Sequence, residues 1–301
     1  MSLHTKVLDG SQQSAVARLF SAAVIRELAQ KGKSPLFSRL IKESLSINEA
    51  SLAAPISEIF ESAFRLLRKK DYRHEYAYKA AITKKLLLGR HSLKTASFVS
   101  EFRVDNCKAD VAIFNGTSTA YEIKSERDNL GRLHTQVSTY KKFFAKVYVI
   151  TGENHLDEIL TTTPPDVGVL LLNNRHGIST IREIQDTPDR VSPGVIFEAI
   201  QLREAVEILR VFGITPPQVA NTEIRSAIGE IFRSLDPVTT HEHMVKVLRK
   251  SRNSLPLAGL LPQLPDSLQA AVLSTPLKLR EQTTLLDAVN TSIREALNWA
   301  R

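Results

Sequence analysis

The sequence is poor in cysteine and contains no long apolar run. Cys107 is the only cysteine among 301 residues, so an internal disulfide framework and cysteine-ligated zinc fingers are excluded. No stretch reaches the roughly 18 to 20 consecutive apolar residues of a transmembrane helix, and the N-terminus lacks a signal-peptide pattern. We therefore expect a soluble cytoplasmic protein without a membrane partner.

Charge is the other unusual feature of the composition. Lys and Arg number 40 against 32 Asp and Glu, which gives a formal net charge of +8. A basic balance of this size is compatible with a nucleic-acid partner but is not diagnostic of one.

The segment 108–124 is the most informative stretch of the chain. It reads as two short strands joined at Asn115-Gly116, a strong hairpin signal. A two-residue turn would place Ala109 opposite Glu122, whereas an odd-length loop that includes Thr117 would place Asp110 there. We predict the odd loop, because its register separates apolar from polar positions.

In that register, the two faces of the hairpin differ in character. One face collects apolar side chains, which we expect to be buried: Val111, Ile113, Tyr121 and Ile123. The other face brings Asp110, Glu122 and Lys124 together between small residues. Two neighbouring carboxylates repel each other, and a hard divalent ion such as Mg²⁺ would relieve that repulsion. The plainer alternative is a solvated hairpin face with an ordinary Glu–Lys pair.

A helix is predicted directly after the hairpin. Apolar residues recur at helical spacing in a stripe that would pack on the sheet: Leu133, Val137, Tyr140 and Phe144. Gln136 and Tyr140 lie one turn apart and can project from the same side. A strand at 146–151 follows, so the chain forms a strand–helix–strand crossover.

These motifs resemble a known family. Asp110 and Glu122-Ile-Lys124 on a hairpin, followed by Gln136-x-x-x-Tyr140, resemble the PD-(D/E)xK restriction-endonuclease-like superfamily, in its RecB-like branch. The longer motif is similar to a poorly characterised bacterial and phage subfamily. The resemblance covers residues 70–175, and Ala109 stands where the family pattern has proline.

The resemblance implies a metal-dependent nuclease. Asp110, Glu122 and the main-chain carbonyl of Ile123 would bind Mg²⁺, with Mn²⁺ as a substitute, and Lys124 would orient the attacking water. Glu75, on a preceding helix at 72–82, would reach the metal directly or through water. As an alternative, Glu75 forms an ordinary helical ion pair with a neighbouring basic residue.

The same resemblance gives roles to the following helix. Gln136 and Tyr140 would position the substrate or support Lys124. The substrate would be nucleic acid, with DNA favoured over RNA.

The expected fold class is α/β, with a mixed α+β sheet. A restriction-endonuclease-like core at 70–190 would lie between a helical region at 1–69 and a C-terminal helical domain at 191–301. Further strands are predicted at 97–104, 167–172 and 178–184. Helical periodicity marks four C-terminal segments, at 195–212, 216–235, 241–252 and 277–299.

Two other functions stay open at this point. The chain could be a catalytically silent, nuclease-like subunit that binds DNA or serves as a scaffold. It could also be a helical interaction module whose C-terminal helices bind a protein partner or a second copy of the chain.

Overall fold

The computed structural model describes residues 8–90 and 92–300, and these fall into two units. The helical unit comprises the residues up to Lys84, the short segment Asn174–His176 and the residues from Leu255 onward. The sheet unit comprises Lys85–Asn173 and Gly177–Ser254. These boundaries differ from the regions 1–69, 70–190 and 191–301 that we expected from composition along the chain.

The helical unit is formed by residues from both the N-terminal and the C-terminal parts of the sequence. Its helices are α1 (Gly10–Arg18), α2 (Ala22–Lys31), α3 (Pro35–Ser44), α4 (Ile56–Leu67), α5 (Glu75–Ala81), α13 (Asp266–Leu273), α14 (Leu279–Val289) and α15 (Ile293–Ala296). The N-terminal helix α2 packs against the C-terminal helix α14, and α4 and α5 both contact α13. The buried aromatic residues of this unit include Phe20, Phe37, Phe60, Phe64, Tyr76 and Tyr78.

Short helical turns connect these and later elements. Ile82–Leu87 is a π-helical segment (η3) that continues into α6 (Leu88–Arg90). The 3₁₀ turns are η1 (Glu49–Ser51), η2 (Lys70–Tyr72), η4 (Glu153–His155), η5 (Pro188–Arg190), η6 (Leu255–Leu257) and η7 (Leu261–Gln263).

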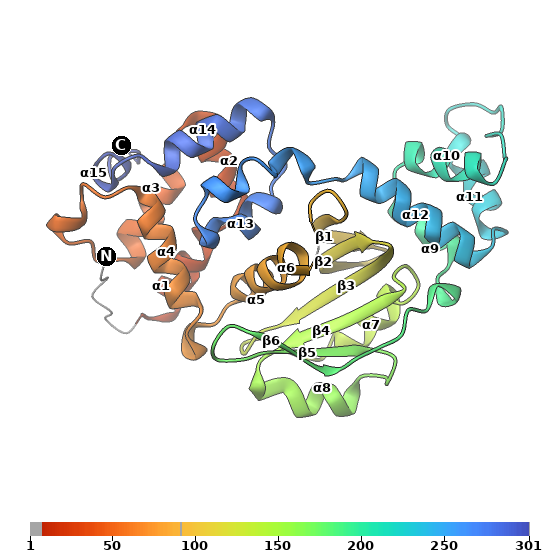
Figure 1. Cartoon of the computed structure of the whole chain (residues 1–301), viewed down its shortest axis with the longest axis horizontal. Coiled ribbons are helices and arrows are strands. Elements are labelled where there is room, and N and C mark those ends of the chain that lie inside the picture. Colours follow the sequence, from red (N-terminus) through yellow and green to blue (C-terminus); the bar gives the residue numbers. More distant parts are fainter. Residues whose placement is uncertain (1–7, 91, 301) are drawn as a thin grey trace. The chain divides into compact units, whose positions relative to one another are not determined.

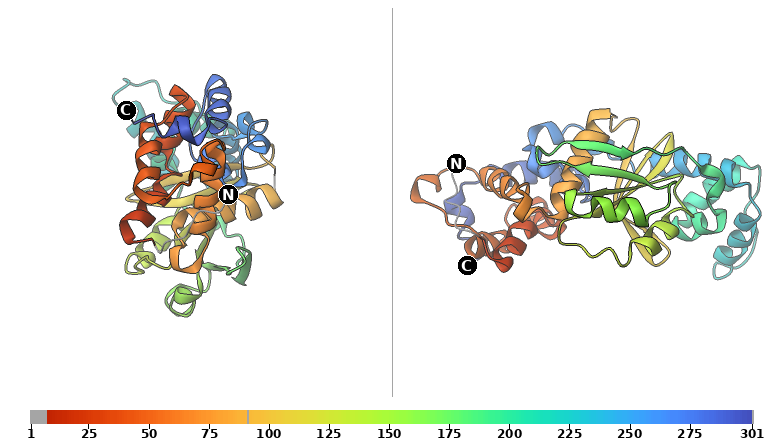
Figure 2. Two further views of the ribbon diagram at one scale, coloured as in Figure 1. Left: turned by 90° about the vertical axis from the view of Figure 1, so that its left-hand side faces the viewer. Right: turned by 90° about the horizontal axis from the view of Figure 1, so that it is seen from below.

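The sheet unit contains one mixed sheet of six strands in sequential order (Figures 1 and 2). The strands are β1 (Ser97–Val104), β2 (Cys107–Asn115), β3 (Thr117–Lys124), β4 (Lys146–Thr151), β5 (Gly168–Leu172) and β6 (Ile178–Arg182). The first three strands are antiparallel, β3, β4 and β5 run parallel, and β6 returns antiparallel at the edge. The predicted mixed α/β class is confirmed.

The β2–β3 hairpin has the predicted odd register. Asn115 pairs with Thr117 and Phe114 with Ser118, and Gly116 at the tip has φ +67°. Glycine adopts this left-handed conformation without steric cost, so it fits a one-residue connection. In this register Asp110 falls at the position of Glu122, as the sequence predicted.

The large core lies on the face that the sequence predicted to be a polar cluster. Ala112, Phe114 and Ala120 belong to it, together with Phe143 and Phe144 after α7. Ala112 and Ala120 are small, so bulky aromatic side chains can pack closely against this face. Val111, Ile113 and Ile123, on the opposite face, are also buried. The prediction of a single buried face was therefore wrong.

Helices of the sheet unit supply the rest of this core. They are α7 (Leu133–Tyr140), α8 (Leu156–Thr162), α9 (Pro193–Ala199), α10 (Leu202–Val211), α11 (Ile224–Arg233) and α12 (Pro237–Ser251). In Figure 1, α7 lies behind β3 and β4.

Three of the predicted C-terminal helices are shorter than expected. The segment 277–299 divides into α14 and α15. The segment 195–212 divides into α9 and α10 at Gln201, whose backbone N–H donates to the Glu204 carboxylate at 2.8 Å. The helix expected from Pro216 begins only at Ile224. Proline lacks the N–H that a helix interior needs, so Pro216-Pro217 belongs to the connection.

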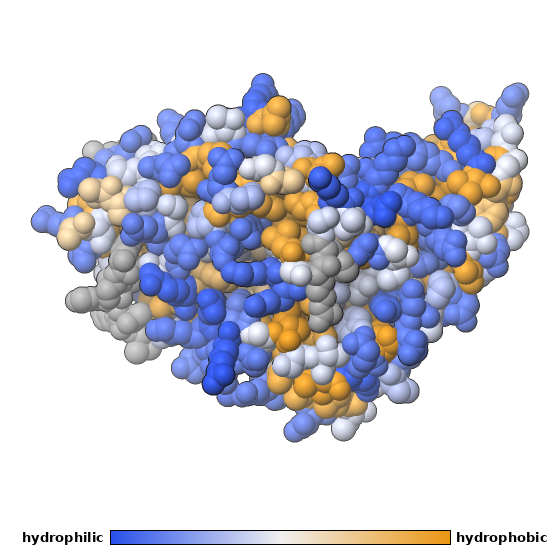
Figure 3. Space-filling view, viewed as in Figure 1, coloured by the Kyte–Doolittle hydropathy of each residue, from blue (hydrophilic) through white to orange (hydrophobic). Residues whose placement is uncertain are grey.

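None of the helices in residues 8–90 and 92–300 has the length and apolar character needed to cross a membrane. In the space-filling view, hydrophilic residues cover much of the visible surface and hydrophobic residues form separate patches (Figure 3).

Candidate functional site

Asp110 is held against the backbone of the neighbouring strand. Its Oδ2 accepts a hydrogen bond from the backbone N–H of Ile123 at 2.6 Å. The regular β2–β3 pairing extends as far as Val111 and Tyr121, and this side-chain bond continues the contact beyond it. The carboxylate of Asp110 therefore lies beside the middle residue of the Glu122–Lys124 segment.

Glu122 and Lys124 form an ion pair that is buried from solvent. Lys124 Nζ donates to Glu122 Oε1 at 2.8 Å and to Gln136 Oε1 on α7 at 2.9 Å. Glu122 is only 2% exposed and Lys124 7%. A buried ion pair is tolerated when further hydrogen bonds satisfy its remaining polar atoms, and Gln136 supplies one of them here.

Tyr140 completes this network from the end of α7. Its hydroxyl lies 2.9 Å from Glu122 Oε2 and 2.6 Å from the carbonyl oxygen of Lys108. Burial raises the pKa of the Tyr140 phenol far above its usual range, and the charges of Glu122 and Asp110 add to that effect. Tyr140 thus stays neutral and donates its proton within the network.

Burial also raises the pKa of the Glu122 carboxyl above its ordinary value. The positive charge of Lys124 and its hydrogen bond act in the opposite direction. The charge of Glu122 therefore depends on Lys124 and on its other hydrogen-bond partners.

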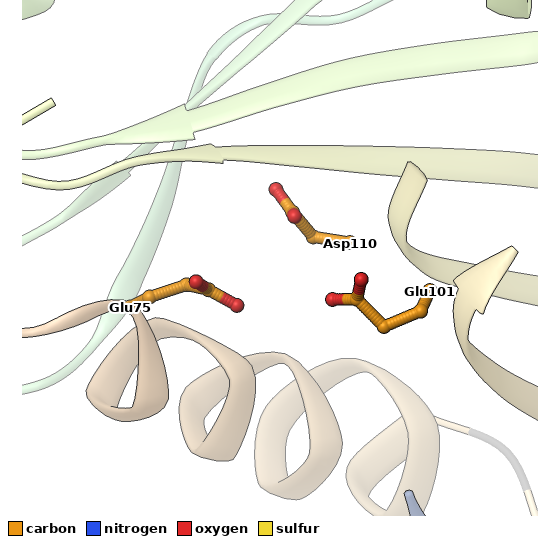
Figure 4. Close-up of side chains that lie close together, drawn as sticks. All are labelled: Glu75, Glu101 and Asp110. Atoms are coloured by element: carbon orange, nitrogen blue, oxygen red, sulfur yellow. The ribbon is translucent and has the colours of Figure 1, made fainter. Parts of the chain in front are cut away.

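Glu101, which the sequence analysis did not single out, lies next to Asp110. One carboxylate oxygen of each residue is within 4.8 Å of the other (Figure 4). Glu101 has φ +56° and stands between the pairs Ser100–Val111 and Phe102–Ala109, opposite Asp110. A left-handed glutamate inside a strand is strained, and such strain occurs most often at functional sites.

The side of the hairpin that contacts the core changes at Asp110. Cys107 and Ala109 contact the core on one side of Asp110, and Ala112 and Phe114 contact it on the other. This change of parity places Glu101 and Asp110 at an interruption of the β1–β2 ladder, where their side chains are less constrained by the pleat.

Glu75 belongs to the helical unit, whereas Glu101 and Asp110 belong to the sheet unit. It lies in the first turn of α5 in the helical unit and pairs with Lys79 at 3.2 Å, the helical ion pair given above as its alternative. Figure 4 also draws its side chain. A contribution of Glu75 to a metal site stays a prediction, as does the role of the Ile123 carbonyl.

The structure therefore brings together most of the predicted site residues. Glu122, Lys124, Gln136 and Tyr140 share one hydrogen-bond network, and Asp110 contacts it through Ile123. Carboxylate oxygens are the ligands that hard divalent cations such as Mg²⁺ prefer, so the donor set fits such an ion.

Glu101 had one sequence signal that was overlooked. In the strand 97–104 it is the only acidic residue, and antiparallel pairing with β2 places it opposite Asp110. Its left-handed backbone has no sequence signal, because glutamate rarely adopts that conformation.

Comparison with known proteins finds a phage protein similar to part of this chain. A curated relative, "Protein cII" of Enterobacteria phage P4, is 31% identical over 127 residues, which cover 41% of this chain and 48% of that protein. The match thus spans about half the length of this relative. Among solved structures, the SPO1766 protein of unknown function from Silicibacter pomeroyi matches 46% of this chain and 93% of its own, with 15% identity and a TM-score of 0.32.

The family match corrects the assignment made from the sequence. Residues 68–255, well over half of the chain, match the family described as Bacteriophage P4 protein cII, and nothing in these comparisons points to a PD-(D/E)xK nuclease. The assignment to that superfamily was wrong, and so were the Mg²⁺-dependent nuclease activity and the description as a hydrolase. Six residues spread along a hairpin and two helices are too few to identify a lineage, since similar geometry recurs in unrelated proteins. The chain belongs to the bacteriophage P4 protein cII family.

Proposed function

We propose that this chain binds nucleic acid through its phosphate backbone and that a divalent cation held by Asp110 and Glu101 contributes to the binding. The observation that carries the proposal is the approach of these two carboxylates to within 4.8 Å on neighbouring strands. Their mutual repulsion is relieved when a cation binds between them. Mg²⁺ is the first candidate, because it retains several waters and binds phosphate oxygens.

Basic residues close to the site in the chain support a phosphate ligand. Lys108 precedes Asp110 by two positions, and Arg127 and Arg132 lie between the hairpin and α7; all three are exposed. The formal net charge of +8 adds a long-range attraction for a polyanion.

The buried network would give this site a fixed shape. Lys124, Glu122, Gln136 and Tyr140 hold β3 against α7 through side-chain hydrogen bonds. Asp110 bonds to the same strand, so its carboxylate would not need to move far when the cation binds. The cation would supply positive charge to the phosphate, and the basic side chains would supply the rest.

Fluorescence anisotropy with labelled duplex DNA, single-stranded DNA and RNA tests the proposal. We expect saturable binding in Mg²⁺ that weakens on the order of tenfold in EDTA, the loss expected when a charged contact is removed. Asp110→Asn should bind the nucleic acid equally with Mg²⁺ and with EDTA. Asp105→Asn, on the adjacent β1–β2 turn, removes the same charge and should keep the Mg²⁺ effect.

Titration of the protein with Mn²⁺, followed by electron paramagnetic resonance, checks the cation directly. Mn²⁺ should bind to the native chain and lose affinity in Asp110→Asn and Glu101→Gln. No binding of any nucleic acid at low salt would overturn the proposal, and EDTA-independent binding would remove the cation from it. Cleavage of the bound strand would show that binding alone is not the function. The choice between DNA and RNA stays a prediction.

A further inference from the structure

The sheet unit contains a polar pocket on the face of the sheet opposite the large core. It has a volume of about 290 Å³ and is lined by residues of β2 to β6 together with Leu86 and Glu183. Cross-strand register explains why these residues meet: Thr119 is aligned with Ile113 and Lys146, and Tyr121 with Tyr148. The pocket is thus built from the same rows of the sheet and needs no residue of the helical unit.

Two tyrosines form its aromatic side. The rings of Tyr121 and Tyr148 are nearly parallel, at 17°, with centroids 5.8 Å apart. The Tyr148 ring lies directly over Gly168 on β5, where a Cβ atom would come within 2.1 Å of the ring. Its hydroxyl donates to the Glu183 carboxylate, so both ends of this side chain are fixed.

A hydroxyl group without a protein partner faces the same space. Thr119 lines the pocket, and its hydroxyl is accessible and makes no hydrogen bond to any other described residue. A ligand that bonds to this hydroxyl replaces a hydrogen bond to water with one of its own. Thr180 and Asn115 add polar groups at the rim.

The single cationic residue among the lining residues is Lys146. It is half-buried and, within residues 8–90 and 92–300, forms no ion pair. Glu183 is the acidic residue of the pocket and already accepts the Tyr148 hydroxyl proton. A ligand with one modest negative charge therefore suits the pocket better than a polyanion does.

From these features we propose that the pocket binds a nucleobase that carries a phosphate. The Tyr121 ring, which is stacked beside Tyr148 and lines the pocket, offers a flat surface for a planar heteroaromatic ring. The hydroxyl of Thr119 bonds to the edge of the base, and Lys146 contacts the phosphate. The pocket volume lies at the lower end of the range for small-ligand sites.

Two sources share this chemistry, a free mononucleotide and an unpaired base of a single strand. Isothermal titration with the four nucleoside monophosphates, and with single-stranded DNA and RNA about ten nucleotides long, separates them. Binding of monophosphates and oligonucleotides with similar affinity identifies a mononucleotide site. Binding of the oligonucleotides alone identifies a site for a base within a strand, provided that Tyr121→Leu weakens it. Oligonucleotide binding that Tyr121→Leu leaves unchanged belongs to the phosphate contacts proposed above and would overturn the inference.

Three variants locate the bound ligand. Tyr121→Leu should weaken binding on the order of tenfold by removing the stacking surface. Thr119→Val, which keeps the shape of the side chain, should weaken it about fivefold through loss of the hydroxyl. Lys146→Ala should weaken binding of phosphorylated ligands and leave unphosphorylated nucleosides unaffected. Lys142→Ala, an exposed lysine after α7, removes the same charge and serves as the control.

All titrations are made in EDTA, so a failure of the proposed cation site would not affect them. No saturable binding of any monophosphate or oligonucleotide would overturn the inference. So would an equal loss of affinity in Lys142→Ala and in the pocket variants. Thermal unfolding of each variant confirms that it is folded, and Thr119→Val keeps the test valid if Tyr121→Leu is unstable.

Discussion

At the scale of single residues, buried polar side chains determine how the sheet unit responds to its environment. His241 on α12 is 2% exposed, and its Nε2 lies 2.8 Å from the Ser118 hydroxyl oxygen. Ser118 Oγ also accepts a hydrogen bond from the backbone N–H of Ala145 at 3.1 Å. These three residues join α12, β3 and the start of β4.

This contact predicts a pH dependence of stability. Burial lowers the pKa of His241 below its ordinary value, so the folded chain holds the ring neutral. The stabilisation is complete above the unfolded pKa of about 6.5 and is lost as pH falls through the lower folded pKa. Chemical denaturation at several pH values should therefore show that His241→Gln costs 1–3 kcal/mol, as an approximate range, at high pH and less at low pH.

His243→Gln is the matched control, because His243 lies two residues away on the same helix and is more exposed. Its cost should be smaller than that of His241→Gln at high pH. A His241→Gln deficit that stays constant from neutral to acidic pH would contradict the assignment of this titration to His241.

The residues of the candidate site were predictable to different degrees. The register that aligns Asp110 with Glu122 followed from the alternation of apolar and polar residues around Asn115-Gly116. Helical spacing after the hairpin predicted that Gln136 and Tyr140 project from the same side, whereas the contact of Gln136 with Lys124 was expected only from the resemblance to the nuclease superfamily. The left-handed backbone of Glu101 could not be predicted, because it depends on how β1 and β2 are paired rather than on local preference.

At the scale of secondary structure elements, one ion pair joins α10 to the end of α12. Glu204 is 1% exposed and accepts from Arg252 Nε at 3.0 Å, from Arg252 Nη2 at 2.8 Å and from the Ser251 hydroxyl at 2.6 Å. The guanidinium group of Arg252 also lies 5.2 Å from the centroid of the Phe102 ring on β1. Arg252 thus connects two helices with the sheet.

Substitution of Arg252 should strongly lower the free energy of unfolding. Arg252→Met keeps much of the apolar contact but leaves the Glu204 carboxylate buried without its cation, which costs about 3–5 kcal/mol. Arg233→Met is the control, since the Arg233–Glu230 pair on α11 is exposed to solvent and should contribute little to stability. The free energies of unfolding from urea titrations test both. Equal losses in the two variants would contradict a special role for the buried pair.

Element boundaries could be predicted from the sequence where turn-forming residues adjoin the element. The bounds of β1 and β4 match their predicted strands, and turn-forming residues follow each of them, Asp105-Asn106 after β1 and Gly152 after β4. The division of 195–212 at Gln201 was missed, since both halves are apolar at helical spacing and the break depends on packing. The face of the sheet that carries the core was missed because Ala112 and Ala120 appear unremarkable until aromatic residues pack on them.

At the scale of the whole molecule, net charge governs how the proposed binding should respond to salt. A chain of formal charge +8 that contacts phosphates releases counterions when it binds. Anisotropy titrations between about 50 and 200 mM salt should show affinity falling by tenfold or more if several phosphates are contacted. Arg132→Ala should reduce the slope by about one contact, and Arg280→Ala, on α14 of the helical unit, should leave it unchanged. A salt-independent affinity would contradict recognition of the backbone.

Association with a second copy or a protein partner through the C-terminal helices stays a prediction at this scale. The structure assigns these helices to different units, α9 to α12 to the sheet unit and α13 to α15 to the helical unit. A partner that uses all of them would contact both units.

The helical unit is assembled from segments at opposite ends of the sequence, with α2 packed on α14. During translation the ribosome releases α2 long before α14 exists, whereas every strand of the sheet follows within one continuous stretch. The apolar side of α2 therefore lacks its contact with α14 until the intervening residues have been synthesised. The contact between α2 and α14 thus forms only after all strands of the sheet have been synthesised, whereas α2 can pack on α3 before that.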